Sequence, residues 1–148
     1  MRVKEIMTTD VKCMQPSASI QQAAQAMVDC DCGGLPVCEQ GTDRLIGFIT
    51  DRDIVCRLLA KNTDLTGRTV QDAMTTDLHI VTPETDLEDC VSMMERFQIR
   101  RVLVADQYGK AVGIVTQADL ARLAEKNPDM KEEVEEALEL ISAPKASM

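Results

Sequence analysis

The chain has 148 residues, of which 45% are hydrophobic and 2% aromatic, and its formal net charge is −9. This acidic balance disfavours sequence-independent binding to nucleic acid and to anionic membranes, both of which need a basic surface. Because no run approaches the roughly 18 apolar residues of a membrane span and the first residues lack the apolar core of a signal peptide, we expect a cytoplasmic protein without nucleic-acid or membrane partners.

The first half of the chain predicts the order strand, helix, strand, strand, helix. A short strand is expected over Val11–Met14. Apolar residues then recur between Ile20 and Val28 at the spacing of a helix that faces a core. Apolar strands over Leu35–Cys38 and Leu45–Thr50 follow. A second helix is expected to carry four apolar residues on one side: Ile54, Val55, Leu58 and Leu59.

The second half predicts the same order. Short strands are expected over Leu78–Val81, Val102–Ala105 and Ala111–Thr116. A helix between the first two carries an apolar stripe from Leu87 to Met94, and Thr85 with Glu88 has the spacing of a capping box at its start. A second helix is expected around Leu120.

The two halves are related by an internal repeat. Val3–Asp10 recurs as Val70–Asp77, at an offset of 67 residues, and Leu45–Asp53 recurs as Ala111–Asp119 after a one-residue slip. A tandem repeat of this kind predicts two like units packed about a pseudo-two-fold axis, in an α/β (α+β) fold. We therefore expect two copies of one site.

Domain boundaries follow from the repeat. The first repeat with its linker spans residues 1–68, and the polar segment Lys61–Arg68 is the linker. The second repeat spans residues 69–125. Residues 126–148 form an acidic tail that predicts a helix with one narrow apolar stripe, either solvated or available to dock a partner or a second copy.

The repeat also allows each cysteine to be compared with its counterpart. Five of the six cysteines align with apolar residues of the other half, which favours small core side chains: Cys13, Cys30, Cys32, Cys38 and Cys90. Cys56 aligns with Arg122 and is the exception. A thiolate cluster of Cys30, Cys32 and Cys38 in a redox or metal sensor remains the alternative, and we expect no metal site.

A recurring Gly-φ-φ-Thr-x-x-Asp element ends each strand that leads into a second helix. It contains Thr50 and Asp53 in the first half, and Thr116 and Asp119 in the second. Each Thr–Asp pair can form a capping box at a helix start. A carboxylate also has two oxygens spaced for two adjacent hydroxyls, as in ribose recognition. The two interpretations are compatible.

These motifs resemble a tandem pair of cystathionine-beta-synthase (CBS) domains, also called a Bateman module. The resemblance rests on Met7-Thr8, Met74-Thr75, Gly34-Leu35-Pro36-Val37 and Gly47–Ile54, and it covers about residues 1–125. It implies two α/β domains packed sheet to sheet, usually as a homodimer, with a regulatory role. It also implies two clefts between the repeats for adenosine-containing ligands such as AMP, ADP, ATP or S-adenosylmethionine.

The resemblance implies two unequal clefts. In the first, Asp53 and Thr50 would hold the ribose, with Arg52 nearby. Met14 and Gln15 would lie beside the base, and Arg100 and Arg101 would contact the phosphate. The alternative for the two arginines is a solvated turn with ion pairs to acidic residues.

The second cleft would contain Asp119, Thr116, Thr82 and Gly34. Its turn, Gly33-Gly34, carries no charge. Because charge-assisted hydrogen bonds contribute on the order of 1.5–3 kcal/mol each, we expect one dominant phosphate site. The second cleft would suit S-adenosylmethionine, which needs no phosphate clamp.

Enzymatic activity has little support. The single histidine, His79, lies in a predicted strand, and the chain contains no P-loop, no HExxH motif and no Ser/His/Asp set. We expect a regulatory module that needs no obligatory cofactor, senses an adenosine ligand and transmits the change to an unidentified partner protein. The alternatives are a ligand-free scaffold or interaction protein and an S-adenosylmethionine binder.

Overall fold

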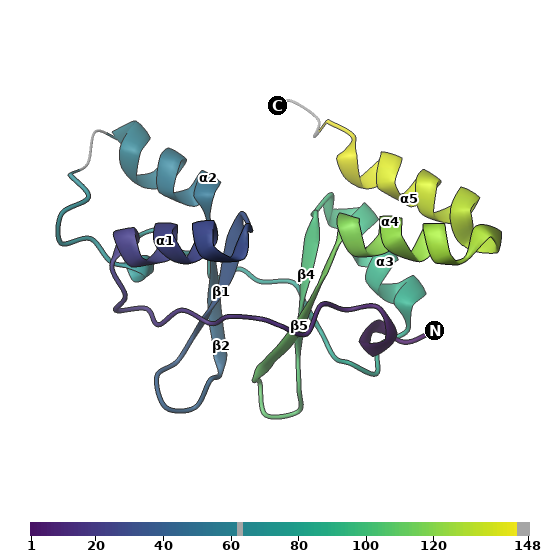
Figure 1. The fold of residues 1–148 in the computed structure, drawn as a ribbon, viewed down its shortest axis with the longest axis horizontal. Helices are drawn as coiled ribbons and strands as arrows, with labels where there is room; N and C mark the ends of the chain where they lie inside the picture. The colour runs from purple at the N-terminus through teal and green to yellow at the C-terminus, as the bar shows by residue number, and fades with distance from the viewer. Residues whose placement is uncertain (62–63, 145–148) are drawn as a thin grey trace. The chain divides into compact units, whose positions relative to one another are not determined.

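The computed structural model describes residues 1–61 and 64–144. The chain folds into two compact units (Figure 1). Unit 1 combines Met1–Asp10 and His79–Asp106 with the chain from Val112 onward. Unit 2 combines Val11–Leu78 with Gln107–Ala111. Each unit is described by itself.

Unit 2 contains the first set of predicted helices and strands: α1 (Ile20–Cys30), β1 (Gly34–Cys38), β2 (Leu45–Thr50) and α2 (Asp51–Asp53). Strands β1 and β2 are antiparallel, and Met14 pairs in parallel with Val37 of β1. The helix that begins with α2 continues through a π-helical turn over Ile54–Leu58 and a 3-10 turn over Leu59–Lys61.

Unit 1 contains the second set together with the helix of the acidic segment: β3 (Ile80–Val81), α3 (Leu87–Phe97), β4 (Arg101–Ala105), β5 (Ala111–Thr116), α4 (Gln117–Lys126) and α5 (Lys131–Ser142). The sheet order is β3-β4-β5, and β3 runs parallel to β4. This mixed fold with two repeats confirms the predicted fold class. Residues 62 and 63 of the predicted linker and residues 145–148 of the predicted tail lie outside the described residues.

Local sequence signals explain where α1 begins and ends. The Ser19 hydroxyl accepts a hydrogen bond from the Gln22 N–H at 3.0 Å, and the Gln22 side chain accepts one from the Ser19 N–H at 2.9 Å. This capping box satisfies donors that the first helical turn leaves open. At the other end, Asp31 adopts a left-handed conformation with φ 51° and stops the helix.

Several local predictions were wrong. Instead of a strand over Val11–Met14, only Met14 pairs with β1, because the chain turns immediately afterwards and the Ala18 N–H donates to the Gln15 carbonyl. Helix α3 begins after Asp86 without a side-chain cap, since the Thr85 hydroxyl lies 3.1 Å from the Thr82 hydroxyl instead.

The side of the second helix that faces the core of unit 2 is narrower than predicted. Ile54 and Leu58 are buried, whereas Val55 and Leu59 are each 52% exposed. The exposed pair lies one position along the helix from the buried pair, and therefore on a different face.

Each Met-Thr segment adds an antiparallel edge to a sheet. In unit 2, Thr75 and Phe48 of β2 exchange two backbone hydrogen bonds of 2.8 and 2.9 Å. In unit 1, Thr8 and Ile114 of β5 do the same at 2.9 and 3.0 Å. The segment that begins the first repeat is therefore packed with the elements of the second repeat, and the segment that begins the second repeat is packed with those of the first.

A glycine in each neighbouring strand permits this close approach. A Cβ atom added at Gly47 would lie 2.8 Å from the Met74 sulfur and 3.1 Å from the Thr75 carbonyl oxygen. A Cβ added at Gly113 would meet the sulfur of Met7 at 2.6 Å. Steric contact with the Met-Thr segment therefore accounts for the recurring glycine.

Replacing Gly47 with alanine is expected to destabilise the protein by about 1–3 kcal/mol, the usual cost of forcing an extra carbon into a packed site. Chemical denaturation of Gly47→Ala measures the change. A second replacement, Met74→Ala, removes the sulfur but leaves the Thr75 carbonyl, so the double variant should recover only part of the loss. A Gly47→Ala protein as stable as the parent would contradict the close approach.

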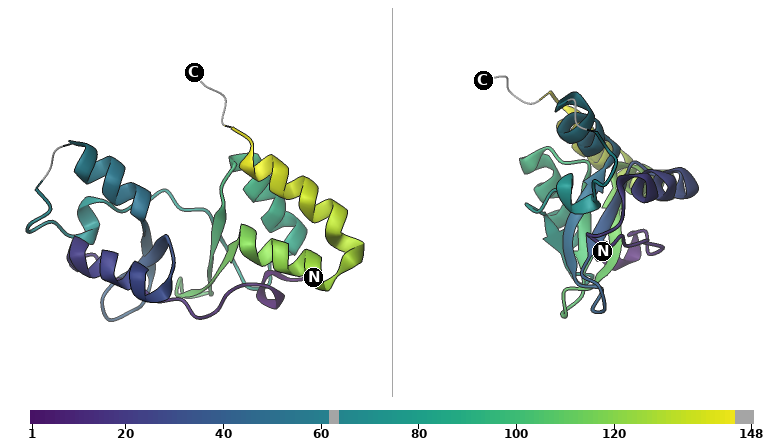
Figure 2. Two further views of the ribbon diagram at one scale, coloured as in Figure 1. Left: turned by 45° about the horizontal axis from the view of Figure 1, so that its top comes forward. Right: turned by 90° about the vertical axis from the view of Figure 1, so that its left-hand side faces the viewer.

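The acidic segment forms a helix that packs on the rest of unit 1. Helix α5 packs against α3 and α4 within unit 1 (Figure 2) and buries Val134, Ala137 and Ile141. None of the helices in residues 1–61 and 64–144 combines the length and the apolar character needed to cross a bilayer.

Candidate functional site

Thr50 and Asp53 form a reciprocal cap where β2 passes into α2. The Thr50 hydroxyl accepts a hydrogen bond from the Asp53 N–H at 2.9 Å, and Asp53 Oδ2 accepts one from the Thr50 N–H at 3.0 Å. The capping interpretation of this motif is therefore confirmed. It uses one carboxylate oxygen of Asp53 and leaves Oδ1 available for a different partner.

Arg57 forms an ion pair with the other oxygen of Asp53 but does not donate a hydrogen bond to it. Its Nε lies 3.6 Å from Asp53 Oδ1, which is an ion pair but too long for a hydrogen bond. The same guanidinium donates to the Met74 carbonyl at 3.0 Å and to the Thr75 hydroxyl at 3.2 Å. The Asp53 side chain is 16% exposed.

The equivalent aspartate of unit 1, Asp119, is buried and accepts hydrogen bonds at both carboxylate oxygens. Asp119 Oδ2 accepts hydrogen bonds from the Thr116 N–H at 2.8 Å and the Thr116 hydroxyl at 3.1 Å. Asp119 Oδ1 accepts from the Thr8 hydroxyl at 2.9 Å and is also contacted by Arg122. The side chain of Asp119 is 2% exposed.

Counting acceptor positions separates the two aspartates. A carboxylate offers about four lone-pair sites. All four are engaged at Asp119, by Thr116 twice, Thr8 and Arg122. At Asp53, the described residues supply one hydrogen bond, from Thr50, and the long contact with Arg57. Only Asp53 retains acceptor capacity for two hydroxyl groups of a ligand.

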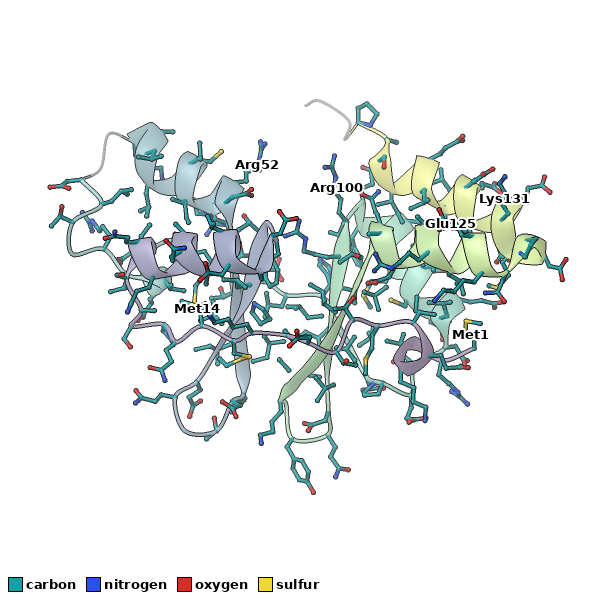
Figure 3. All side chains as sticks on the ribbon, in the orientation of Figure 1. Met1, Met14, Arg52, Arg100, Glu125 and Lys131 are labelled. Carbon is teal, nitrogen blue, oxygen red and sulfur yellow. A yellow bond between two sulfur atoms is a disulfide. The ribbon has the colours of Figure 1, made fainter. Side chains whose placement is uncertain are left out.

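The other first-cleft residues of unit 2 differ in accessibility. Met14 is 9% exposed, and its side chain belongs to the core of the unit, whereas Gln15 is exposed. Gln15 is therefore the better placed of the two for a base. Arg52 is exposed, and its side chain extends outward from the first turn of α2 (Figure 3).

Arg101 is the first residue of β4 in unit 1. Arg100 directly precedes it (Figure 3). The Arg100 carbonyl accepts a hydrogen bond from the Gln117 N–H at 3.2 Å, which places Arg100 beside the turn that carries Thr116 and Asp119. In unit 2, the Gly33 carbonyl makes the equivalent contact with the Asp51 N–H at 3.0 Å.

The remaining residues predicted for the second cleft are spread over the two units. Gly34 of unit 2 pairs with Thr50 across β1 and β2. Thr82 of unit 1 is exposed, and its hydroxyl contacts that of Thr85. The side chain of Asp119 is instead contacted by Thr8, Thr116 and Arg122.

Three residues of these sites were missed from the sequence. Arg57 and Arg122 lie four and three residues after their aspartates, a spacing at which opposite charges meet on a helix, so the signal was present. Thr8 belongs to the Met-Thr motif, but its contact joins residues 111 positions apart. Neither helical periodicity nor spacing indicates such a contact.

The cysteine prediction was partly wrong. Cys38 and Cys90 are buried as expected, but Cys30 is exposed. Disulfides join Cys13 to Cys38 and Cys30 to Cys32. Within the part of the chain that the structure describes, no three side chains among His, Cys, Asp and Glu are grouped as a metal site.

A pocket of about 610 Å³ lies in unit 1 where α5 packs beside α3 and α4. It is lined by apolar residues such as Leu87 and Leu123, and also by Glu88, Glu95 and Glu133. These carboxylates disfavour a phosphate ligand. The pocket is therefore not the nucleotide site that the sequence predicts.

The family model described as CBS domain matches the chain twice, over residues 3–60 and 70–126. Among curated proteins, the CBS domain-containing protein YhcV of Bacillus subtilis (strain 168) is 43% identical over 120 residues, which cover 80% of this chain and 82% of that protein.

Solved structures show the same similarity. The CBS domain pair of protein MJ0100, in complex with 5-methylthioadenosine and S-adenosyl-L-methionine, has a TM-score of 0.74 and is 28% identical, covering 85% of this chain and 97% of that chain. CBSX2 in complex with AMP has a TM-score of 0.72 and is 29% identical, covering 84% and 96%. CBSX2 is a protein of Arabidopsis thaliana.

Proposed function

The chain belongs to the CBS domain family, and from this premise we propose that it is a regulatory module that binds an adenosine-containing ligand through Asp53. Binding shifts the conformation of the module, and a partner protein responds to the shift. The module performs no reaction of its own, and its function is to report the ligand.

The observation that carries this proposal is the difference between the two aspartates. Asp53 keeps one carboxylate oxygen without a hydrogen bond from the described residues and is partly exposed. Asp119 is saturated and buried. A ribose diol can add two hydrogen bonds at Asp53, whereas at Asp119 it would have to displace Thr8 or Arg122.

The class of ligand follows from the chemistry and from similar proteins. A carboxylate that accepts from adjacent hydroxyls selects a ribose, and the exposed Gln15 amide can bond an adenine edge. AMP is bound by CBSX2, and S-adenosyl-L-methionine by MJ0100. We favour AMP, ADP or ATP over S-adenosylmethionine because the chain carries Arg100 and Arg101, which suit a phosphate.

A nucleotide panel tests the proposal. A ligand that binds only the native state at 100 times its Kd stabilises it by about 2.7 kcal/mol. For a chain of this length, such stabilisation raises the midpoint of thermal unfolding by about 5–10 °C. We expect this shift with at least one of AMP, ADP and ATP, and one dominant site per chain by calorimetry. No shift with any adenosine ligand at millimolar concentration would reject the proposal.

The phosphate contacts are tested by removing one guanidinium. Arg101→Ala is expected to weaken nucleotide binding by about 10- to 100-fold, because one or two charge-assisted hydrogen bonds are lost. Adenosine, which has no phosphate, is the control ligand and should bind both proteins alike. A double-mutant cycle with Asp53→Asn then shows whether the two residues contact the same ligand molecule, since non-additive losses indicate coupling.

A ligand-free scaffold is the second candidate function, and the closure of Asp119 by Thr8 and Arg122 favours it for one of the two repeats. A scaffold would show no thermal shift with any nucleotide. The homodimer that the family resemblance implies is also part of our proposal. On the helices of unit 2, Val28, Val55 and Leu59 have exposed apolar side chains that a second copy would cover.

A further inference from the structure

Four of the six cysteines form two pairs, both in unit 2. The Cα atoms of Cys13 and Cys38 are 5.7 Å apart, and those of Cys30 and Cys32 are 5.3 Å apart. Both distances lie within the range that a disulfide requires. Cys56 and Cys90 are free thiols, the first exposed and the second buried.

The internal repeat shows that the fold does not need the Cys13–Cys38 link. The equivalent residues of unit 1, at the offset of 67, are Ile80 and Ala105. There, β3 and β4 pair in parallel without any cysteine, and the Leu103 N–H donates to the His79 carbonyl at 3.2 Å. Apolar side chains therefore suffice for this pairing.

The same holds for the Cys30–Cys32 pair. Its equivalents are Phe97 and Ile99, which flank Gln98 at the end of α3. Gln98 has the same left-handed φ of 51° as Asp31, so the turn forms without a cross-link. In both places, the cysteines add a covalent bond to a structure that forms in the other repeat without cysteines.

The Cys13–Cys38 link acts on a short segment that is otherwise held by few bonds. Met14 N–H donates to the Pro36 carbonyl at 2.8 Å, and Cys38 N–H donates to the Met14 carbonyl at 2.8 Å. These two hydrogen bonds attach the segment to β1, and the disulfide adds a covalent bond beside them. Gln15, the proposed base contact, follows directly.

We propose that Cys13 and Cys38 form a reversible thiol–disulfide site that fixes the Met14 segment on β1 when oxidised and loosens it when reduced. A low-molecular-weight disulfide such as oxidised glutathione is the oxidant. The two protein thiols give up two electrons and two protons, the glutathione disulfide bond breaks, and one protein disulfide and two glutathione thiols result. Any effect on ligand affinity rests on the proposed function, whereas the effect on the segment does not.

The two pairs should react at different rates. Cys30 is exposed, whereas Cys38 is 2% exposed and Cys13 is half-buried. Attack by a thiolate requires access to a sulfur atom. A reductant should therefore open the Cys30–Cys32 pair first and the Cys13–Cys38 pair more slowly.

Thiol counting and peptide mapping test the linkage in the full chain. After oxidation, the denatured protein should contain two free thiols, Cys56 and Cys90, and after reduction by dithiothreitol it should contain all six. In the native protein Cys90 should react slowly, because burial raises the pKa of its thiol to about 11. Six thiols after oxidation, or a map that joins other cysteines, would overturn the proposal.

Hydrogen exchange tests the segment without any ligand. Reduction is expected to speed exchange of the Met14 and Cys38 amides by about tenfold or more, because the segment then opens locally. The Leu103 amide of unit 1, which donates to the His79 carbonyl where β3 and β4 pair, has no cysteine beside it and should not change. Cys13→Ser should show fast exchange even under oxidising conditions, whereas Cys30→Ser should not. Equal protection in both redox states would refute the site.

AMP titration of the oxidised and reduced proteins separates this proposal from the nucleotide proposal. Weaker binding by the reduced protein supports both. Equal binding in the two states overturns the coupling to the ligand. Absence of binding in both states, with the exchange difference present, counts against the nucleotide proposal and supports the thiol site alone.

Discussion

Replacing Asp53 with asparagine is expected to weaken nucleotide binding by about 100-fold, since the loss of charge-assisted bonds to two hydroxyl groups costs about 3 kcal/mol. Asparagine keeps one side-chain oxygen, which can still accept the hydrogen bond from the Thr50 N–H that caps the helix. The substitution therefore removes the charge and one acceptor while it preserves the local structure. Isothermal titration with AMP measures the change.

Asp119→Asn is the matched control. Because both oxygens of Asp119 already bond to Thr8, Thr116 and Arg122, this variant should change AMP affinity by less than about threefold. It should instead lower the stability of unit 1, since the buried contact with Arg122 loses its charge. Equal losses of affinity at the two positions would contradict the assignment of one dominant site to Asp53.

The internal repeat made much of the fold predictable. Comparing the halves residue by residue predicted the strand and helix order, and each Thr–Asp cap forms as the spacing indicates. The prediction of one dominant site came from the charges at Arg100 and Arg101. The structure adds an independent reason for it, since Asp119 is closed by neighbours that Asp53 lacks.

The closure of Asp119 could not be predicted from the repeat. Thr8 begins the first repeat in sequence, yet it pairs with β5 of the second and donates to Asp119. Its counterpart Thr75 instead accepts a hydrogen bond from Arg57. Thr8 and Thr75 are equivalent in sequence. However, the arginine that contacts the aspartate lies three residues after it in unit 1 and four residues after it in unit 2. The contacts of the two threonines therefore differ.

The cysteines show a second limit. Cys30 and Phe97 occupy equivalent positions in the two repeats, but Phe97 is itself 42% exposed. An apolar counterpart in the other repeat therefore does not guarantee that a cysteine is buried. The approach of Cys30 to Cys32 depends on the left-handed conformation of Asp31, a residue type that tolerates positive φ without requiring it. Pairing of the two cysteines is therefore a property of the folded turn.

Replacing Ile141 with aspartate is expected to destabilise the protein by about 3–5 kcal/mol, because a charge is placed in the core of unit 1 without a partner. Ile141 is 2% exposed and belongs to the same apolar cluster as Leu120 and Leu123 of α4. In a chain of this length, the midpoint of thermal unfolding should fall by about 10 °C.

Leu140→Asp is the control for this experiment, because it introduces the same charge one residue earlier on α5, at a side chain that is 49% exposed. It should leave stability within about 0.5 kcal/mol of the parent. The contrast tests whether α5 is part of the core of unit 1 or a solvated tail. If both variants unfold at the temperature of the parent, α5 does not pack on α3 and α4 in solution. If only Ile141→Asp is destabilised, the acidic segment is a structural element of the module, and removing it to study the repeats alone would expose the apolar side chains that it now covers.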